Sequence, residues 1–123
     1  MRSELSKIRS RIQKWVNALE SGQYKQGRLA LSDDDNNYCC LGVGNKVCRL
    51  HESSNTVFVT TYYQLGLIDD CGCLTRHYDG YESLADLNDN NYKFQTIAKL
   101  IRNNPELMFT EDVVAHLKKY PLR

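Results

Sequence analysis

The chain of 123 residues has no long apolar run, and it begins with a charged amphipathic segment. A membrane-spanning helix needs about 18 or more apolar residues in succession, and a secretory signal peptide needs an apolar stretch near its start. The sequence therefore predicts a protein that is kept in the cytoplasm and contacts no membrane. A chain of this length forms one core, so we expect residues 1–123 to be a single domain.

The chain also lacks Cys-x-x-Cys pairs, and its five cysteines are an odd number. An odd count without a signal peptide excludes a disulfide framework and predicts reduced thiols, mostly buried as small apolar side chains. We predict no metal and no cofactor. One alternative stays open, a structural zinc site with soft ligands drawn from Cys48, His51, Cys71, Cys73 and His77. A zinc-stabilised module would contain stoichiometric zinc, and elemental analysis showing none would exclude it.

Signatures of catalysis are missing as well. The sequence contains no glycine-framed nucleophile, and no cysteine has a histidine beside it in a recognisable catalytic pattern. The acidic run Asp33–Asp35 lacks the spaced ligands and distal glutamate of a calcium loop, so it reads as a solvated turn. We therefore predict a protein that is not an enzyme.

Helical periodicity is strongest at the N-terminus, where apolar residues recur at steps of three and four. These residues are Leu5, Ile8, Ile12, Trp15, Val16 and Leu19. Ser3 is placed to cap the first turn, and Gly22 is placed to take the left-handed conformation that ends a helix. The pattern predicts a helix over residues 3–21.

The rest of the chain alternates short patterns with turn residues. In the first half it predicts a hairpin of strands 28–31 and 37–40 and a short helix over 41–50. The middle of the chain predicts a possible strand at 57–59, a short helix that begins at Thr60 or Thr61 and stops at Gly66, an edge strand or turn over 71–74, and a loop over 77–80. The last part predicts a helix over 84–89 capped by Ser83, a helix from Phe94 that stops at 103–105, and a last helix from Thr110. The expected fold class is α+β: a long N-terminal helix packed on a small antiparallel hairpin or sheet, with several short helices.

Charge is unevenly distributed along the chain. Residues 1–49 hold nine Lys or Arg against five Asp or Glu, and residues 50–123 hold seven against ten. A basic N-terminal part beside a mildly acidic C-terminal part suits an anionic partner or self-association. A solvated helix face explains the same pattern without any partner.

The segment 24–28, Tyr-Lys-Gln-Gly-Arg, combines the residue types that bind nucleotides. Lys25 and Arg28 would neutralise phosphates, arginine through its two-pronged guanidinium group. Tyr24 would stack on a base, together with Tyr38 or Tyr92. The structural alternative is that Tyr24 anchors the first helix while both cations are simply exposed.

Residues 83–103 offer a second reading, because two short helices separated by a turn resemble a helix-turn-helix. Lys93, Gln95, Thr96 and Lys99 would then face a duplex. The acidic stretch 82–89 repels phosphate, which weighs against nucleic acid as the partner. Simple packing of two helices accounts for the same pattern.

Several motifs spread over residues 12–102 resemble a widespread family of small phage-encoded proteins. They are Trp15-Val16-x-Ala18-Leu19-x-Ser21-Gly22-x-Tyr24-Lys25-Gln26-Gly27, Tyr38-Cys39-Cys40-Leu41-Gly42-Val43, Leu65-Gly66-Leu67, Ser83-Leu84-Ala85-x-Leu87-Asn88-Asp89 and Phe94-x-x-Ile97-Ala98-x-x-Ile101. Small phage proteins of this kind include inhibitors of bacterial defence, and some of those sequester cyclic nucleotide signals without cleaving them, often at oligomer interfaces.

The resemblance and the basic-aromatic segment together imply a non-enzymatic phage anti-defence protein in the host bacterial cytoplasm. It would bind a cyclic nucleotide immune signal as a homo-oligomer. In that site Asn88 would read a base edge and Asp89 a ribose hydroxyl, beside the residues named above. The alternative is a small phage regulator that binds DNA or a host protein through residues 83–103.

Two positions depart from the family pattern. Gly44-Asn45 stands where the family has a leucine-cysteine pair, which weakens the helix expected after Val43. Lys93 stands where the family has a serine cap, and a cation is unfavourable at a helix N-terminus.

Overall fold

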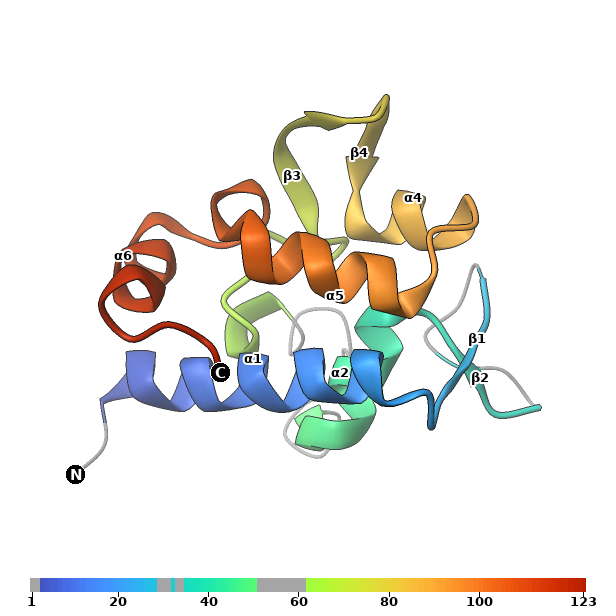
Figure 1. Ribbon diagram of the computed structural model, residues 1–123, viewed down its shortest axis with the longest axis horizontal. Coiled ribbons are helices and arrows are strands. Elements are labelled where there is room, and N and C mark those ends of the chain that lie inside the picture. Colours follow the sequence, from blue (N-terminus) through green and yellow to red (C-terminus); the bar gives the residue numbers. More distant parts are fainter. Residues whose placement is uncertain (1–2, 29–31, 33–34, 51–61) are drawn as a thin grey trace.

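Figure 1 shows a computed structural model of the protein, which describes residues 3–28, 32, 35–50 and 62–123. Its elements are α1 (Glu4–Ser21), β1 (Lys25–Gln26), β2 (Asn37–Tyr38), α2 (Cys40–Cys48), β3 (Cys73–Tyr78), β4 (Tyr81–Ser83), α4 (Leu84–Asp89), α5 (Phe94–Asn103), the 3-10 turn η2 (Pro105–Leu107) and α6 (Glu111–Lys119). The predicted α+β class is confirmed: one long N-terminal helix is combined with shorter helices and two small sheets.

Helix α1 has the predicted boundaries. The Ser3 hydroxyl accepts a hydrogen bond from the Ser6 amide at 3.1 Å, and Gly22 ends the helix with a φ of 76°. One face of α1 is buried, and its members are Ile8, Ile12, Trp15, Val16 and Leu19. Burying that face drives the helix onto the rest of the core, because apolar area removed from water contributes about 25 cal/mol per Å².

The elements are arranged in levels around α1. Helix α1 contacts α2, α5 and α6, whereas the β3–β4 pair contacts α4 and η2. In Figure 1, α1 lies along the bottom, α5 runs above it, and the β3–β4 hairpin projects beyond α5 at the top. The buried apolar side chains form one cluster that includes residues of α1, α2, α4, α5 and α6.

The first sheet differs from the predicted hairpin. Strands β1 and β2 pair in parallel, with Lys25 opposite Asn37 and Gln26 opposite Tyr38. The first strand lies earlier than predicted, because Lys25 and Gln26, within the predicted turn 23–27, pair with Asn37 and Tyr38. Residues 29–31 of the predicted strand lie outside the described part of the chain, and Ser32 forms an antiparallel bridge with Tyr38.

The antiparallel hairpin lies further along the chain. Strand β3 continues to Tyr78, so the predicted loop over 77–80 is reduced to the two-residue turn Asp79-Gly80. Both turn residues have positive φ values, 54° and 83°. Two-residue turns with positive φ match the twist of paired strands, and Asp-Gly is a favoured sequence for them.

Helix α2 forms despite its two glycines. The Cys39 thiol caps it by accepting a hydrogen bond from the Gly42 amide at 3.4 Å, and the helix runs through Gly44 and Asn45. A methyl group at Gly44 would lie 2.7 Å from Leu65 Cδ1 and 3.1 Å from Trp15 Cδ1. Glycine therefore lets α2 approach α1 closely, which offsets its low helix propensity.

The later helices begin where the sequence predicts, and Ser83 caps α4 whereas Thr110 makes no side-chain cap bond. Ser83 accepts a hydrogen bond from the Asp86 amide at 3.0 Å, and Thr110 precedes α6. Residues 62–64 are helical and Gly66 has a φ of 70°, so the predicted stop at Gly66 is confirmed. The strand predicted at 57–59 and the start of the helix at Thr60 or Thr61 fall outside the described residues.

We predict that Gly44→Val destabilises the protein by about 1–3 kcal/mol, because overpacking a filled core forces side chains off their rotamers. The measurement is denaturant unfolding. Lys46→Val, in the same helix but exposed, is the matched control and should cost about 0.5 kcal/mol or less. Valine has a higher helix propensity than glycine, so propensity alone would stabilise Gly44→Val, and an unchanged or raised stability would contradict the packing role of Gly44.

Candidate functional site

A buried asparagine lies where the sequence motifs meet. Asn88, at 1% exposure, accepts hydrogen bonds through Oδ1 from the Cys40 amide at 3.0 Å and from Gln26 Nε2 at 2.9 Å. Its Nδ2 donates to the Gly27 carbonyl at 2.8 Å and to the Asp89 carboxylate at 3.3 Å. Both lone pairs and both protons of the amide are engaged, so nothing is left for a ligand.

Gln26 extends this network to α5. Its Nε2 also donates to the Tyr92 carbonyl at 2.6 Å, and its Oε1 accepts from the Phe94 amide at 3.2 Å. Lys93, at the cap position of α5, makes no side-chain cap bond. Gln26 therefore supplies from β1 the helix cap that the local sequence lacks.

Other motif residues complete the same junction. Trp15 Nε1 donates to the Cys40 carbonyl at 2.8 Å, and the Gly27 amide donates to the Tyr38 carbonyl at 2.7 Å. A methyl group at Gly27 would lie 2.9 Å from the Cβ of Asn37. The Trp-to-Gly, Tyr-Cys-Cys and Leu-Asn-Asp motifs thus build one scaffold, and the prediction that Asn88 reads a base is corrected to a structural role.

The remaining predicted site residues fall into two groups. Tyr24 and Tyr38 form an edge-to-face pair with ring centroids 5.7 Å apart, next to the exposed Lys25. Arg28 reaches the other group, because its guanidinium group donates to the side chain of Asn91, next to Tyr92. Asp89 is half-buried and its carboxylate accepts from Asn88.

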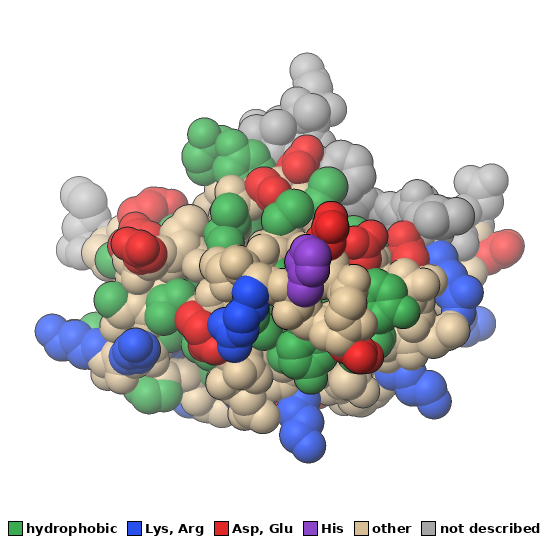
Figure 2. Space-filling model, turned by 90° about the horizontal axis from the view of Figure 1, so that it is seen from above, with side chains coloured by type: hydrophobic (Ala, Val, Ile, Leu, Met, Phe, Trp, Pro, Cys, Tyr) green, Lys and Arg blue, Asp and Glu red, His purple; other side chains and the backbone are tan. Residues whose placement is uncertain are grey.

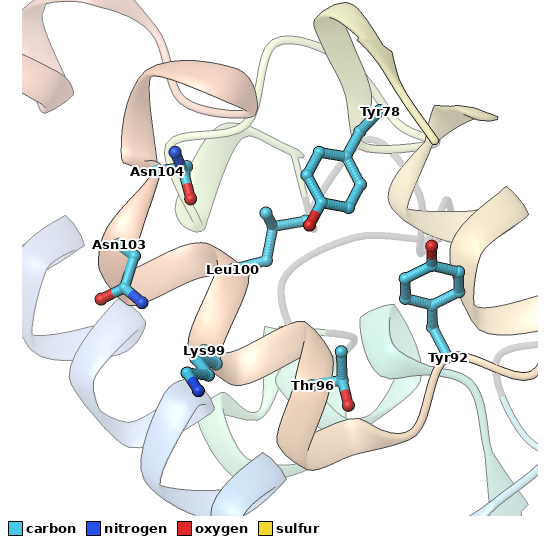
Figure 3. Close-up of a pocket in the computed structure, with 7 residues that line it drawn as sticks. All are labelled: Tyr78, Tyr92, Thr96, Lys99, Leu100, Asn103 and Asn104. Atoms are coloured by element: carbon cyan, nitrogen blue, oxygen red, sulfur yellow. The ribbon is translucent and has the colours of Figure 1, made fainter. Parts of the chain in front are cut away.

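A cleft opens between the hairpin and α5 (Figure 3). Its volume is about 280 Å³, and it is lined by Tyr78, Tyr92, Thr96, Lys99, Leu100, Asn103 and Asn104. Tyr78 reaches toward α5 from the hairpin, and Tyr92 rises from the segment before α5. Two aromatic rings, one ammonium group and two amides thus lie together, and no Asp or Glu is among the described lining residues.

The hairpin is tied to Tyr92. The Tyr92 hydroxyl donates to the Asp79 carboxylate in the hairpin turn, and this bond raises the pKa of Tyr92 to about 12. The Tyr92 ring also meets Tyr81 and Tyr78 edge-on, with centroids 6.0 and 6.5 Å away. These contacts fix one wall of the cleft relative to the other.

Part of this cleft is predictable from the sequence. The sequence predicts that Tyr92 stacks on a base, and it indicates Thr96 and Lys99 only for the DNA-binding alternative. It does not indicate Tyr78, Asn103 or Asn104; the signal for Tyr78 is the high count of eight tyrosines. Tyr78 in β3 and Asn103 at the end of α5 are 25 positions apart, and only the folded hairpin brings them together.

The thiols are poor nucleophiles. Burial raises the pKa of Cys39, and raises that of the fully buried Cys40 well above its usual value. The Asp69 carboxylate accepts a hydrogen bond from Cys73 and raises its pKa to about 12. Because their pKa values are raised, these thiols stay protonated near neutral pH, and a protonated thiol is a poor nucleophile.

The described residues contain no cluster of three or more His, Cys, Asp or Glu side chains placed to hold a metal ion. Cys71, Cys73 and His77 belong to that part of the chain, whereas His51 falls outside it. Among the helices that the structure describes, none is long and apolar enough to cross a membrane.

The helix-turn-helix alternative retains its exposed residues. Lys93, Gln95, Thr96 and Lys99 are exposed at the start and along one side of α5. Asp86 is exposed on α4 and Glu82 on β4, so acidic groups lie on the adjoining elements. Figure 2, which looks onto the face with the hairpin, shows hydrophobic side chains between charges of both signs, unlike the uniformly basic surface that DNA favours.

We predict that Asn88→Ala lowers the free energy of unfolding by about 2–5 kcal/mol. The substitution leaves the Cys40 amide and the Gly27 carbonyl without partners, and each buried unpaired group costs about 1–3 kcal/mol. Asn103→Ala, at an exposed position, should change stability by about 0.5 kcal/mol or less. Denaturant unfolding measures both, and a small loss in Asn88→Ala would contradict the structural role.

We also predict that Asp79→Asn returns the pKa of Tyr92 from about 12 toward the usual value near 10. Without the carboxylate the phenolate no longer faces a negative charge, and asparagine tolerates the positive φ of this turn. At pH 11 the variant should show one more ionised tyrosine than the wild type by ultraviolet absorbance. Adding Tyr92→Phe should remove that extra signal, and its persistence would assign the signal to another tyrosine.

The comparison with curated proteins and the comparison with solved structures gave no match. A family model does match residues 7–77, which include most of α1, the β1–β2 pair, α2 and most of β3. The match covers more than half of the chain and includes the Trp-to-Gly and Tyr-Cys-Cys motifs of the junction. The chain therefore belongs to the family described as Domain of unknown function (DUF8296).

Proposed function

We propose that this protein is a non-enzymatic phage anti-defence protein that binds a cyclic nucleotide immune signal and sequesters it intact in the host cytoplasm. The observation that carries the proposal is the cleft between the hairpin and α5, which combines Tyr78, Tyr92 and Lys99 with two asparagines. The phage origin and the host compartment rest on the motif resemblance.

The lining suits a nucleotide chemically. Tyrosine rings stack on bases of any sequence, and such stacking contributes about 1–3 kcal/mol per base. The Lys99 ammonium group would neutralise a phosphate, and the amides of Asn103 and Asn104 would donate to and accept from a base edge. No Asp or Glu is among the described lining residues, and the adjoining Asp79 carboxylate is bonded to the Tyr92 hydroxyl, so the Lys99 ammonium group is the charge in the lining that an anionic ligand would meet.

The size of the cleft favours one nucleotide unit. Its volume of about 280 Å³ falls just below the range of ligand pockets, which span about 300–1,000 Å³. A cyclic dinucleotide would extend beyond it. We propose that a second copy of the chain covers the remainder, in a homo-oligomer, and that Arg28, tied to Asn91 beside Tyr92, contacts the second phosphate.

Sequestration without cleavage fits the chemistry of the cleft. No cysteine, histidine or carboxylate is among its described lining residues, so no nucleophile–base pair faces a bound phosphate. The DNA-binding alternative would use the same Thr96 and Lys99. The exposed acids at Glu82 and Asp86 count against it, because they lie beside the phosphate path.

The test is a thermal-shift screen against cyclic di- and trinucleotides and cyclic ADP-ribose isomers, followed by recovery of the ligand after denaturation. A ligand at about 100 times its Kd stabilises the fold by about 2.7 kcal/mol. We expect one ligand to raise the melting temperature and to be recovered intact. Recovery of an altered ligand would make the protein an enzyme, and no shift across the panel would overturn the proposal.

A matched pair of charge reversals localises the site. Lys99→Glu should abolish the shift, whereas Lys93→Glu, which makes the same charge change at an exposed residue outside the cleft, should preserve it. If both variants lose binding equally, net charge and not the cleft determines affinity.

Arg28→Ala should weaken binding at least tenfold while the melting temperature of the free protein stays within about 2 °C of the wild type, because an exposed hydrogen bond contributes little to stability. Isothermal calorimetry with the ligand identified in the screen measures the affinity. Unchanged affinity would remove Arg28 from the site.

A further inference from the structure

A second hollowed surface lies away from the cleft, where residues 120–123 return to α1. Two adjoining hollows of about 600 and 370 Å³ share Arg9 and Arg123 in their walls. The α1 residues that line them are Ser3, Ser6, Arg9, Ser10, Gln13, Lys14 and Asn17. We refer to the two adjoining hollows together as the groove; their lining follows α1 from residue 3 to residue 17, about 21 Å at 1.5 Å per residue.

The groove carries cations and no side-chain acids. Arg9, Lys14, Lys119 and Arg123 line it, together with His116, and none of its described lining residues is Asp or Glu. The acids nearest in sequence on α1 are engaged elsewhere: Glu4 pairs with Arg11 at 3.7 Å and Glu20 with Arg102 at 2.7 Å. A one-sign groove of this kind raises the local concentration of anions.

Two of the groove's walls are held in place by hydrogen bonds. Arg9 donates from Nε to the Tyr120 carbonyl at 2.7 Å and from Nη2 to the Pro121 carbonyl at 2.5 Å. Gln13 Oε1 accepts from the Arg123 amide at 2.7 Å. The segment after α6 is therefore fixed along α1, and the groove exists before any ligand arrives.

An aromatic ring is presented in the groove. Tyr120 is 48% exposed, its ring lies 4.9 Å from that of His116, and the Lys119 ammonium group stands 5.6 Å from its centroid. A ring with an ammonium group beside it offers a stacking surface for a base and a positive charge for the neighbouring phosphate. Grooves that bind single-stranded nucleic acid combine these two features.

We propose that this groove binds single-stranded nucleic acid, with the phosphates on Arg9, Lys14 and Lys119 and a base on Tyr120. The length of the groove suits several successive phosphates, so it exceeds what a single nucleotide needs. An exposed ring favours unpaired bases, because duplex bases are already stacked. The acidic stretch 82–89, which counts against nucleic acid at α5, does not line this groove.

The experiment uses fluorescence anisotropy with the full chain and a labelled oligothymidylate of about ten nucleotides, within the site sizes of single-strand grooves. We expect the logarithm of the association constant to fall with the logarithm of the salt concentration at a slope of about −2 to −3, since each phosphate contact contributes about −0.7. Tyr120→Ala should weaken binding at least fivefold without reducing that slope. An unchanged affinity in Tyr120→Ala would overturn the stacking role.

The matched controls are two double charge reversals. Lys14→Glu with Lys119→Glu should weaken binding at least thirtyfold, and Lys46→Glu with Lys93→Glu, two exposed lysines outside the groove, should weaken it less than threefold. Equal losses, or no binding by the wild type, would overturn the proposal. Tighter binding of a duplex of the same length would contradict the proposed preference for single strands. Lys99→Glu should leave oligothymidylate binding intact, which separates this site from the cleft.

Discussion

The paired amides of Gln26 and Asn88 hold the fold together. One hydrogen bond of 2.9 Å joins them, and around it the two side chains bond to β1, to the start of α2 and to the start of α5. Fully engaged polar groups in a low-dielectric interior specify one arrangement of the chain, because every alternative leaves a buried donor or acceptor unpaired. Segments that lie more than 60 positions apart in the sequence are thereby fixed relative to one another.

Two glycines allow close packing of the elements around that junction. Gly44 lets α2 contact Trp15, and Gly27 brings β1 against Asn37. The indole nitrogen of Trp15 then reaches the Cys40 carbonyl, the residue whose amide Asn88 binds. Apolar packing and amide bonding therefore converge on the first turn of α2. The cleft adjoins this junction through the Tyr92 carbonyl, whereas the groove lies along α1 where residues 120–123 return to it.

Much of the fold was predictable because its signals are local. Ser3, Ser83 and Gly22 mark helix ends through bonds or dihedral angles that involve only near neighbours. The parallel pairing of β1 with β2 is not predictable, since a two-residue strand is too short to show an alternation of apolar and polar side chains. Asn88 looked like a ligand contact because its burial depends on Gln26, 62 positions away. The cleft was missed for a similar reason: Tyr78 reaches α5 only once the Asp79-Gly80 turn has formed.

The cap that Gln26 gives α5 also has a consequence for the order of folding. A helix capped by a neighbouring residue gains its cap bond as soon as its first turn forms, but the Phe94 amide bonds to Gln26, a side chain 68 residues upstream. Closing the loop between these two residues costs conformational entropy before the hydrogen bond can form. We therefore expect the first turn of α5, which follows Tyr92 and carries Thr96 at the cleft, to be completed late, when the N-terminal segment docks. Assembly of the cleft between the hairpin and α5 is in this way coupled to docking of the N-terminal segment.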